Sequence, residues 1–147
     1  MLTWGEFANA APEMASFGEA RLKFGVFYLA TIGPDSYPRV HPFTPFVGSG
    51  HLFAFMYPTS PKGKDLQRNH KYAMHSLVAD MNGTNGEFQI RGVASLITDP
   101  PRRKEAESAC PYPMVEPNVL FEFMIGRCLT NYYEGGKPHP KHWTSTE

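Results

Sequence analysis

The chain has 147 residues, and its 14 Lys and Arg residues balance its 14 Asp and Glu residues, so the formal net charge is zero. This balance argues against the strong overall positive field with which proteins bind nucleic acid or an anionic membrane, although a local basic patch is compatible with it. The length predicts one domain over residues 1–147. The only two cysteines, Cys110 and Cys128, form no C-x-x-C pair, which argues against a disulfide framework or structural zinc site and is typical of a reducing cytoplasm.

The N-terminal segment predicts helix over residues 1–22. Thr3, followed by Glu6 three residues later, has the pattern of a capping box, and apolar residues then recur at helical spacing. Pro12 interrupts or restarts this helix. The first twenty residues contain no Lys or Arg and no apolar core segment, so we expect no signal peptide. The longest strongly apolar run, residues 26–32, is too short to span a bilayer.

From residue 24 onward, β-branched and aromatic runs alternate with turn residues. Three such runs are close neighbours in the sequence and predict an antiparallel meander. The second contains Pro42 and Pro45, which cannot donate hydrogen bonds to a sheet, so we expect it at an edge or at a bulge. A final segment is expected to form either a hairpin or one bent strand. The predicted strands are 24–32, 39–47, 51–57, 72–79, 87–97 and 119–134.

Two helices are expected between these strands. One covers residues 62–69, and the other follows Asp99, which is placed to cap a first turn containing two prolines. Residues 134–147 show little pattern and are expected to form a tail. Five to seven strands with few helices predict a mainly β fold, a small β-barrel with flanking helices, whose barrel spans residues 24–133.

The junction between the third strand and the first inserted helix has the composition of a phosphate-binding loop. Thr59 and Ser60 supply hydroxyl groups, Lys62 and Lys64 supply positive charge, and Gly63 allows close approach of the backbone. A phosphate bound where a helix begins requires these kinds of donors. An ordinary exposed loop, in which the serine caps the helix, is the alternative, because the spacing is not that of a Walker A motif.

A second candidate cluster lies on the proline-containing strand. Arg39 and His41 are two residues apart, so their side chains point to the same face of a strand. Close to a phosphate loop, this basic pair is suited to a flat, phosphorylated cofactor, while a purely structural histidine is the alternative. His139 and His142 predict no metal site, because prolines surround them and no acidic or cysteine partner is near.

The order of these segments resembles the core of the pyridoxamine 5′-phosphate oxidase-related flavoproteins. The resemblance covers residues 24–97 and rests on the succession of "LAT", a turn, "PRVHP", an aromatic strand and "SPKGKDL". It implies a split β-barrel that binds flavin mononucleotide (FMN), and a homodimer with the cofactor at its interface. Relatives of this fold use a deazaflavin or bind haem, so these two cofactors are alternatives to FMN. A flavin-binding or storage module without turnover is the alternative to an enzyme.

The resemblance also implies which residues hold the phosphate of the cofactor. These are Arg39, which opens the second strand, together with Ser60 and Lys62 of the loop. The oxidase itself has a basic residue where Pro61 stands here, and Lys64 is positioned to compensate for the lost charge.

The flavin ring is expected, on the same resemblance, to lie beside the backbone of the second strand and against the end of the third. The residues concerned are Val40, His41, Pro42, Phe55 and Met56.

The C-terminal segment departs from the oxidase. The oxidase ends in an arginine-containing segment that helps to hold pyridoxine phosphate, whereas this chain has no arginine after Arg127. We therefore expect an FMN-dependent oxidoreductase that acts on another small molecule, and we assign no catalytic residue. Trp143 is expected either to cover the flavin ring, from this subunit or its partner, or only to dock the tail.

Overall fold

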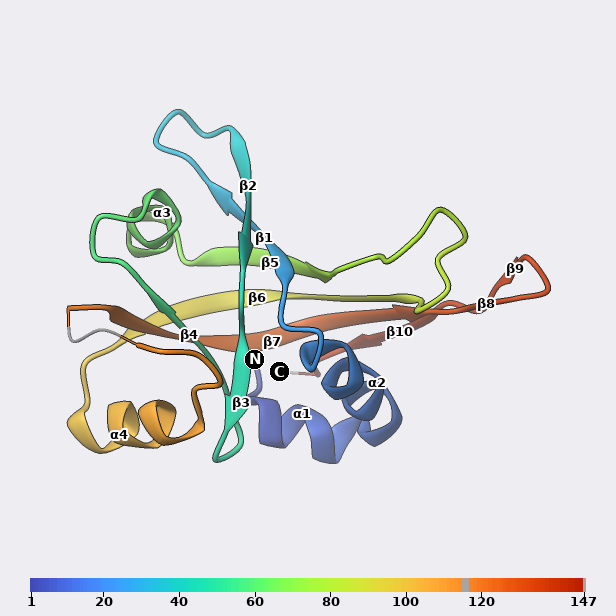
Figure 1. The fold of residues 1–147 in the computed structure, drawn as a ribbon, viewed down its shortest axis with the longest axis horizontal. Coiled ribbons are helices and arrows are strands. Elements are labelled where there is room, and N and C mark those ends of the chain that lie inside the picture. The colour runs from blue at the N-terminus through green and yellow to red at the C-terminus, as the bar shows by residue number, and fades with distance from the viewer. Residues whose placement is uncertain (115–116, 147) are drawn as a thin grey trace.

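The computed structural model describes residues 1–114 and 117–146. Within them the chain forms four helices, an eight-stranded antiparallel sheet and a separate two-stranded ribbon (Figure 1). The helices are α1 (Trp4–Ala10), α2 (Pro12–Leu22), α3 (Pro61–Arg68) and α4 (Pro100–Ala109). The strands are β1 (Phe27–Ile32), β2 (Pro38–Phe43), β3 (Phe46–Gly48), β4 (His51–Met56), β5 (Lys71–Ser76), β6 (Glu87–Ile97), β7 (Val119–Asn131), β8 (Tyr133–Glu134), β9 (Lys137–Pro138) and β10 (Lys141–Thr144).

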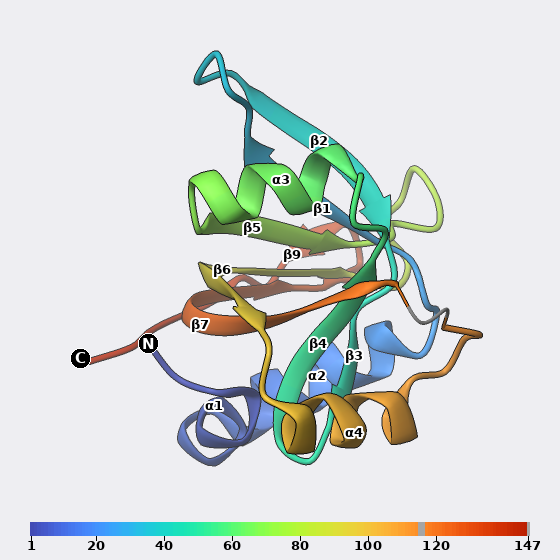
Figure 2. The ribbon, with the colours of Figure 1, turned by 90° about the vertical axis from the view of Figure 1, so that its left-hand side faces the viewer.

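The large sheet curls into a half-barrel, which confirms the prediction of a mainly β barrel fold. Its strands follow the order β2-β1-β5-β6-β7-β4-β3, with β10 also pairing with β7. The two end strands, β2 and β3, are nevertheless consecutive in the chain and are separated only by Thr44 and Pro45. This short connection requires the two ends of the sheet to approach each other, and the curvature is visible in Figure 2.

The predicted three-stranded meander is correct only for its first pair. β1 and β2 pair antiparallel, and β2 is an edge strand, as its prolines predicted. The third run, β4, pairs with β3 and β7 instead of β2. The error arose because the run over residues 39–47 is two strands, and the chain leaves one end of the sheet and enters the other at Thr44 and Pro45.

The C-terminal segment, residues 134–147, differs from the expectation of a patternless tail, because part of it pairs with the last long strand. Residues 119–131 form one long strand, β7, whose second edge is shared by three segments. β4 pairs with its first part, Leu2 bridges to Ile125, and β10 pairs with Arg127–Thr130. The tail therefore belongs to the sheet, although its short strand carries too little apolar alternation to be recognised from sequence.

Two apolar clusters stabilise the fold. The larger one fills the concave side of the sheet and is closed by α1 and α2, where Trp4 and Phe7 are buried. The predicted capping box of Thr3 and Glu6 is present at the start of α1. A smaller cluster lies under α4 and includes Phe55. None of the described helices is long and apolar enough to cross a membrane.

Candidate functional site at the start of helix α3

A cleft of about 520 Å³ opens where the ends of β2 and β4 meet the start of α3. This volume lies in the range of small-molecule sites. Apolar and aromatic residues line the cleft together with two lysines, a threonine and an asparagine. The lining includes Pro42, Phe55, Met56, Lys62, Tyr112 and Asn118.

The N-terminus of α3 presents hydrogen-bond donors that the described part of the chain leaves unused. Ser60 occupies the N-cap position, but its side chain makes no capping hydrogen bond. Its Oγ atom is buried and has no partner among the described residues. The backbone N–H groups of Lys62 and Gly63 also find no acceptor there, since the first helical bond runs from Lys64 N to Ser60 O. Unpaired buried polar groups are costly, so this end of the helix is suited to an anionic ligand.

Lys62 brings a positive charge to the same place. Its side chain is half-buried, lines the cleft and forms no ion pair with a described residue. Burial lowers the pKa of its ammonium group, which a bound anion would oppose. Lys64 is exposed. Gly63 faces inward, where an added Cβ would lie 3.6 Å from the ring of Phe121, an ordinary van der Waals contact, so packing does not require a glycine here.

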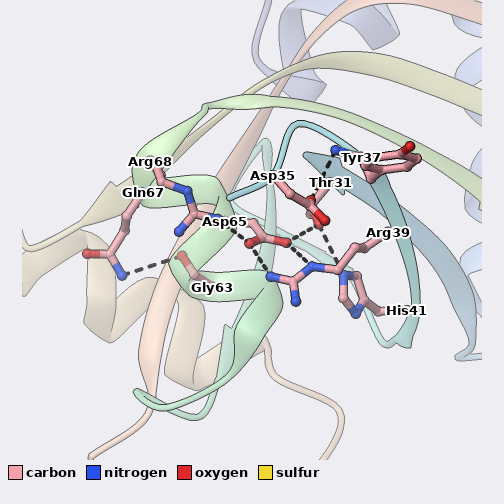
Figure 3. A network of polar contacts seen from close by, with 9 residues as sticks. All are labelled: Thr31, Asp35, Tyr37, Arg39, His41, Gly63, Asp65, Gln67 and Arg68. Atoms are coloured by element: carbon pink, nitrogen blue, oxygen red, sulfur yellow. Dashed lines mark hydrogen bonds and ion pairs between the residues drawn. The ribbon is translucent and has the colours of Figure 1, made fainter. Parts of the chain in front are cut away.

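A buried carboxylate, Asp65, lies one turn further along α3 (Figure 3). Arg39 binds it in a fork, with Nε 2.9 Å from Oδ2 and Nη2 on Oδ1, and Arg68 Nη2 lies 2.6 Å from Oδ1. Thr31 Oγ donates to Oδ2 at 2.7 Å. Burial alone would raise the pKa of the Asp65 carboxyl, but the hydrogen bonds from Arg39 and the other partners outweigh it and hold the pKa at about 2. Asp65 thus fixes α3 to the β1–β2 hairpin.

His41 is joined to this network through Thr31. Its Nε2 atom lies 3.0 Å from Thr31 Oγ, as Figure 3 shows. Burial lowers the pKa of the imidazole, and the nearby charge of Lys62 lowers it further. A neutral imidazole is therefore favoured beside the cleft. The contacts of Arg39 and His41 confirm that both side chains lie on one face of β2.

The other predicted site residues divide into three groups. Pro42, Phe55 and Met56 line the cleft with Lys62. Val40 lies on the opposite face of β2 and is 69% exposed. Trp143 lies elsewhere in this chain, on β10, where its ring contacts Phe7 with centroids 5.0 Å apart. This contact docks the tail, and a role for the partner's copy at a cofactor stays a prediction.

Four residues of the site were not identified from sequence. Thr31 and Asp65 complete the polar network. Of these two, only Asp65 could have been suspected from sequence, because it precedes Arg68 by three residues on a predicted helix. Tyr112 accepts a hydrogen bond from the backbone N–H of Phe55, and burial raises its pKa to about 12. Asn118 Oδ1 is buried without a partner among the described residues. No local pattern places these last two beside the cleft.

Comparison with known proteins identifies the same family that the order of the sequence segments resembles. A family model described as pyridoxamine 5′-phosphate oxidase matches residues 12–128. No curated protein sequence matches the chain significantly.

Several solved structures share the fold. A haem-binding protein from Mycobacterium smegmatis has a TM-score of 0.67 and 14% identity, over 88% of this chain and 57% of its own. The chain thus spans little more than half the length of that protein. A NimC/NimA family protein from Clostridium acetobutylicum has a TM-score of 0.64 and 22% identity, over 86% and 94% of the two chains. The haem storage protein HutZ from Vibrio cholerae has a TM-score of 0.60 and 15% identity, over 78% and 89%.

Proposed function

Because this chain belongs to the pyridoxamine 5′-phosphate oxidase family, we propose that it is a flavoprotein that binds FMN in the cleft at the start of α3. The observation that carries the proposal is the buried Oγ of Ser60 at the N-cap of α3, which has no partner among the described residues, together with Lys62 two residues later, which forms no ion pair with any of them. A hydroxyl, free N–H groups and a cation are the donors that a phosphate monoester accepts.

Arg39 has a more limited part in this proposal than the resemblance implied. Its Nε and Nη2 atoms already bind Asp65, which leaves Nη1 for a phosphate. The hydrogen bonds that the guanidinium donates to Asp65 raise its pKa, so the charge is permanent. We therefore assign Arg39 first to holding Asp65 and second to the phosphate, while Lys64 adds positive charge from the exposed side of α3.

The apolar part of the cleft is proposed to hold the flavin ring. Phe55 and Met56 end β4, Pro42 comes from β2, and Tyr112 also lines the cleft. Asn118 Oδ1 and the backbone groups of β2 offer polar contacts to the edge of the ring. The bound flavin would supply the redox chemistry, while the protein supplies phosphate anchoring, ring packing and the nearby charges. On this basis we propose an FMN-dependent oxidoreductase of a small molecule.

We also propose that the protein is a homodimer. Alternate residues of the β1–β2 hairpin form an apolar outer face at the edge of the sheet, and Tyr28 and Val40 are 40% and 69% exposed there. Pro42 lies on this face and also lines the cleft. A partner packed on the hairpin would therefore cover the face and approach the cofactor. Light scattering at micromolar concentration tests this, and a monomer would contradict it.

Haem is the second candidate ligand, because two of the structural neighbours are a haem-binding and a haem storage protein. The absorption spectrum and mass of the ligand that co-purifies distinguish the candidates. Flavin absorption bands and the mass of FMN are the expected result. A Soret band would instead identify haem as the ligand. Reduction of the bound flavin by NADH or NADPH without oxygen then separates an oxidoreductase from a storage module.

A further inference from the structure

The hydrogen-bond chain from Asp65 to His41 has a fixed direction. Thr31 Oγ lies 2.7 Å from Asp65 Oδ2 and 3.0 Å from His41 Nε2. Asp65 is ionised at neutral pH and can only accept hydrogen bonds. The single proton of the Thr31 hydroxyl must therefore lie between Thr31 and Asp65, since otherwise two oxygen lone pairs would face each other at 2.7 Å.

This direction determines the protonation of the imidazole. With its proton committed to Asp65, Thr31 can only accept at its second contact, so His41 Nε2 must carry a hydrogen. In the neutral imidazole the other nitrogen, Nδ1, is then an unprotonated acceptor. Nδ1 makes no hydrogen bond to any described residue, and Figure 3 shows it on the side of the ring away from Thr31.

His41 is linked to the proposed ligand site through Lys62. Lys62 lines the cleft, and its charge is close enough to lower the pKa of the imidazole, whereas the neighbouring Pro42 lies on the opposite face of β2. The charged groups facing His41 are Lys62 and Asp65 from α3 and Arg39 from β2. The two positive groups oppose protonation and only the carboxylate favours it, which is consistent with a neutral ring at neutral pH.

We propose that Asp65 and Thr31 are positioning residues that hold His41 in the Nε2–H tautomer, so that Nδ1 is a hydrogen-bond acceptor on the ring that lies near Lys62 of the cleft. The ligand group that suits this acceptor carries an N–H or O–H, as the imide of a flavin does. The tautomer follows from the contacts of the protein alone, while the role toward a ligand rests on the proposed function.

Nitrogen-15 NMR of the histidine ring, recorded without ligand at a pH above the pKa of His41, tests the tautomer directly. In wild type the Nε2–H tautomer should be about tenfold more populated than the Nδ1–H tautomer, because one hydrogen bond contributes about this factor. Thr31→Ser keeps the hydroxyl and should preserve this signature, whereas Thr31→Val should weaken it. An Nδ1–H tautomer in wild type, or no difference between the serine and valine variants, would overturn the proposal.

Asp65→Asn provides a sharper test because it should reverse the chain. Two arginine N–H groups point at the Oδ1 position, whereas one arginine N–H and the rotatable hydroxyl of Thr31 point at the Oδ2 position. The amide oxygen should therefore remain at the Oδ1 position, where it meets more fixed donors, and the amide nitrogen should face Thr31. The asparagine would then donate to Thr31, Thr31 would donate to Nε2, and His41 should change to the Nδ1–H tautomer. A folded Asp65→Asn protein with the wild-type tautomer would contradict the chain, and the wild-type and Thr31 measurements decide the matter if this variant does not fold.

Addition of FMN to the labelled wild-type protein tests the role toward a ligand. The Nδ1 resonance should shift in proportion to the bound fraction, which flavin fluorescence measures separately. Bound FMN without any shift of Nδ1 would overturn the contact proposed for His41. Absence of FMN binding would instead overturn the proposed function, while the tautomer measured without ligand would still stand or fall on its own result.

Discussion

Two buried carboxylates hold the two inserted helices on the sheet, and they differ in what lies beyond them. Asp65 and Glu122 have side chains that are 0% and 4% exposed, and each is bound by two basic residues. Glu122 lies on β7 and accepts from His51 Nδ1 at 2.6 Å and from Arg102 Nη1 at 2.7 Å, which joins β4 and α4 to the barrel. Asp65 in the same way joins α3 to β1 and β2.

The difference between the two clusters lies in their connections. The contacts of Glu122 end at His51 and Arg102, next to the apolar cluster under α4. The contacts of Asp65 continue through Thr31 to His41, which lies near Lys62, a lysine that lines the cleft and forms no ion pair with a described residue. Paired buried charges alone are therefore no indication of a ligand site. Ser60 Oγ, which is buried without a partner among the described residues, distinguishes the Asp65 side of the molecule.

The largest expected effect is that substitution of either carboxylate lowers stability, whereas only substitution of Asp65 also lowers FMN affinity. Asp65→Asn should lower the free energy of unfolding by about 3 kcal/mol, and Glu122→Gln by about 2 kcal/mol, because fewer charged hydrogen bonds are lost at Glu122. Urea denaturation measures both. Only Asp65→Asn should also weaken FMN binding, by about tenfold, the value of one charge-assisted hydrogen bond. An equal loss of FMN affinity in Glu122→Gln would remove the distinction between the clusters.

The second effect is a dependence of stability on pH. The pKa of Asp65 is about 2 in the folded protein and about 3.9 in an unfolded chain, so its contribution is complete above the unfolded value and is lost as the pH falls toward 2. The loss amounts to about 2 kcal/mol between pH 5 and pH 2. Asp65→Asn should lose less stability over this interval than wild type. Identical slopes for the two proteins would show that Asp65 is not the group responsible.

A smaller effect should distinguish the two arginines. Arg39→Lys replaces a two-bond fork by a point charge and should lower the free energy of unfolding less than Asp65→Asn does. It should also reduce FMN affinity severalfold, because the Nη1 atom proposed for the phosphate is lost. Arg102→Lys removes a single bond to Glu122 and should leave FMN affinity unchanged. Parallel fluorescence titrations provide the comparison, and an Arg39→Lys protein that binds like wild type would exclude Arg39 from the phosphate site.

Local sequence patterns predicted the elements better than their arrangement. Thr3 with Glu6, and Asp99 before its two prolines, form the caps that their spacing indicated, and β6 has the predicted bounds. These features depend on neighbours within four residues or on a simple alternation. The pairing of β4 with β7 joins segments more than sixty residues apart, and the pairing of β10 with β7 joins segments about ten residues apart. No local sequence pattern indicates either pairing.

The site shows the same limit. The lysine loop could be recognised because its hydroxyls, glycine and lysines are consecutive, and Arg39 and His41 because strand alternation places them on one face. The partners of these residues come from other elements. Asp65 reaches Arg39 only because α3 packs on the β1–β2 hairpin, so the sequence offered no reason to expect that the arginine fork is already in use.

Comparison of FMN with riboflavin, which lacks the phosphate, tests the central claim most directly. Wild type should bind FMN at least about 100-fold more tightly than riboflavin, since Ser60 and Lys62 each contribute about 1.5–3 kcal/mol through charge-assisted hydrogen bonds to the phosphate. Ser60→Ala combined with Lys62→Ala should remove most of this preference and leave riboflavin affinity unchanged. The exposed Lys64→Ala serves as the matched control and should change FMN affinity less than about threefold. A double variant that binds FMN within twofold of wild type would contradict the assignment of the start of α3 as the phosphate site.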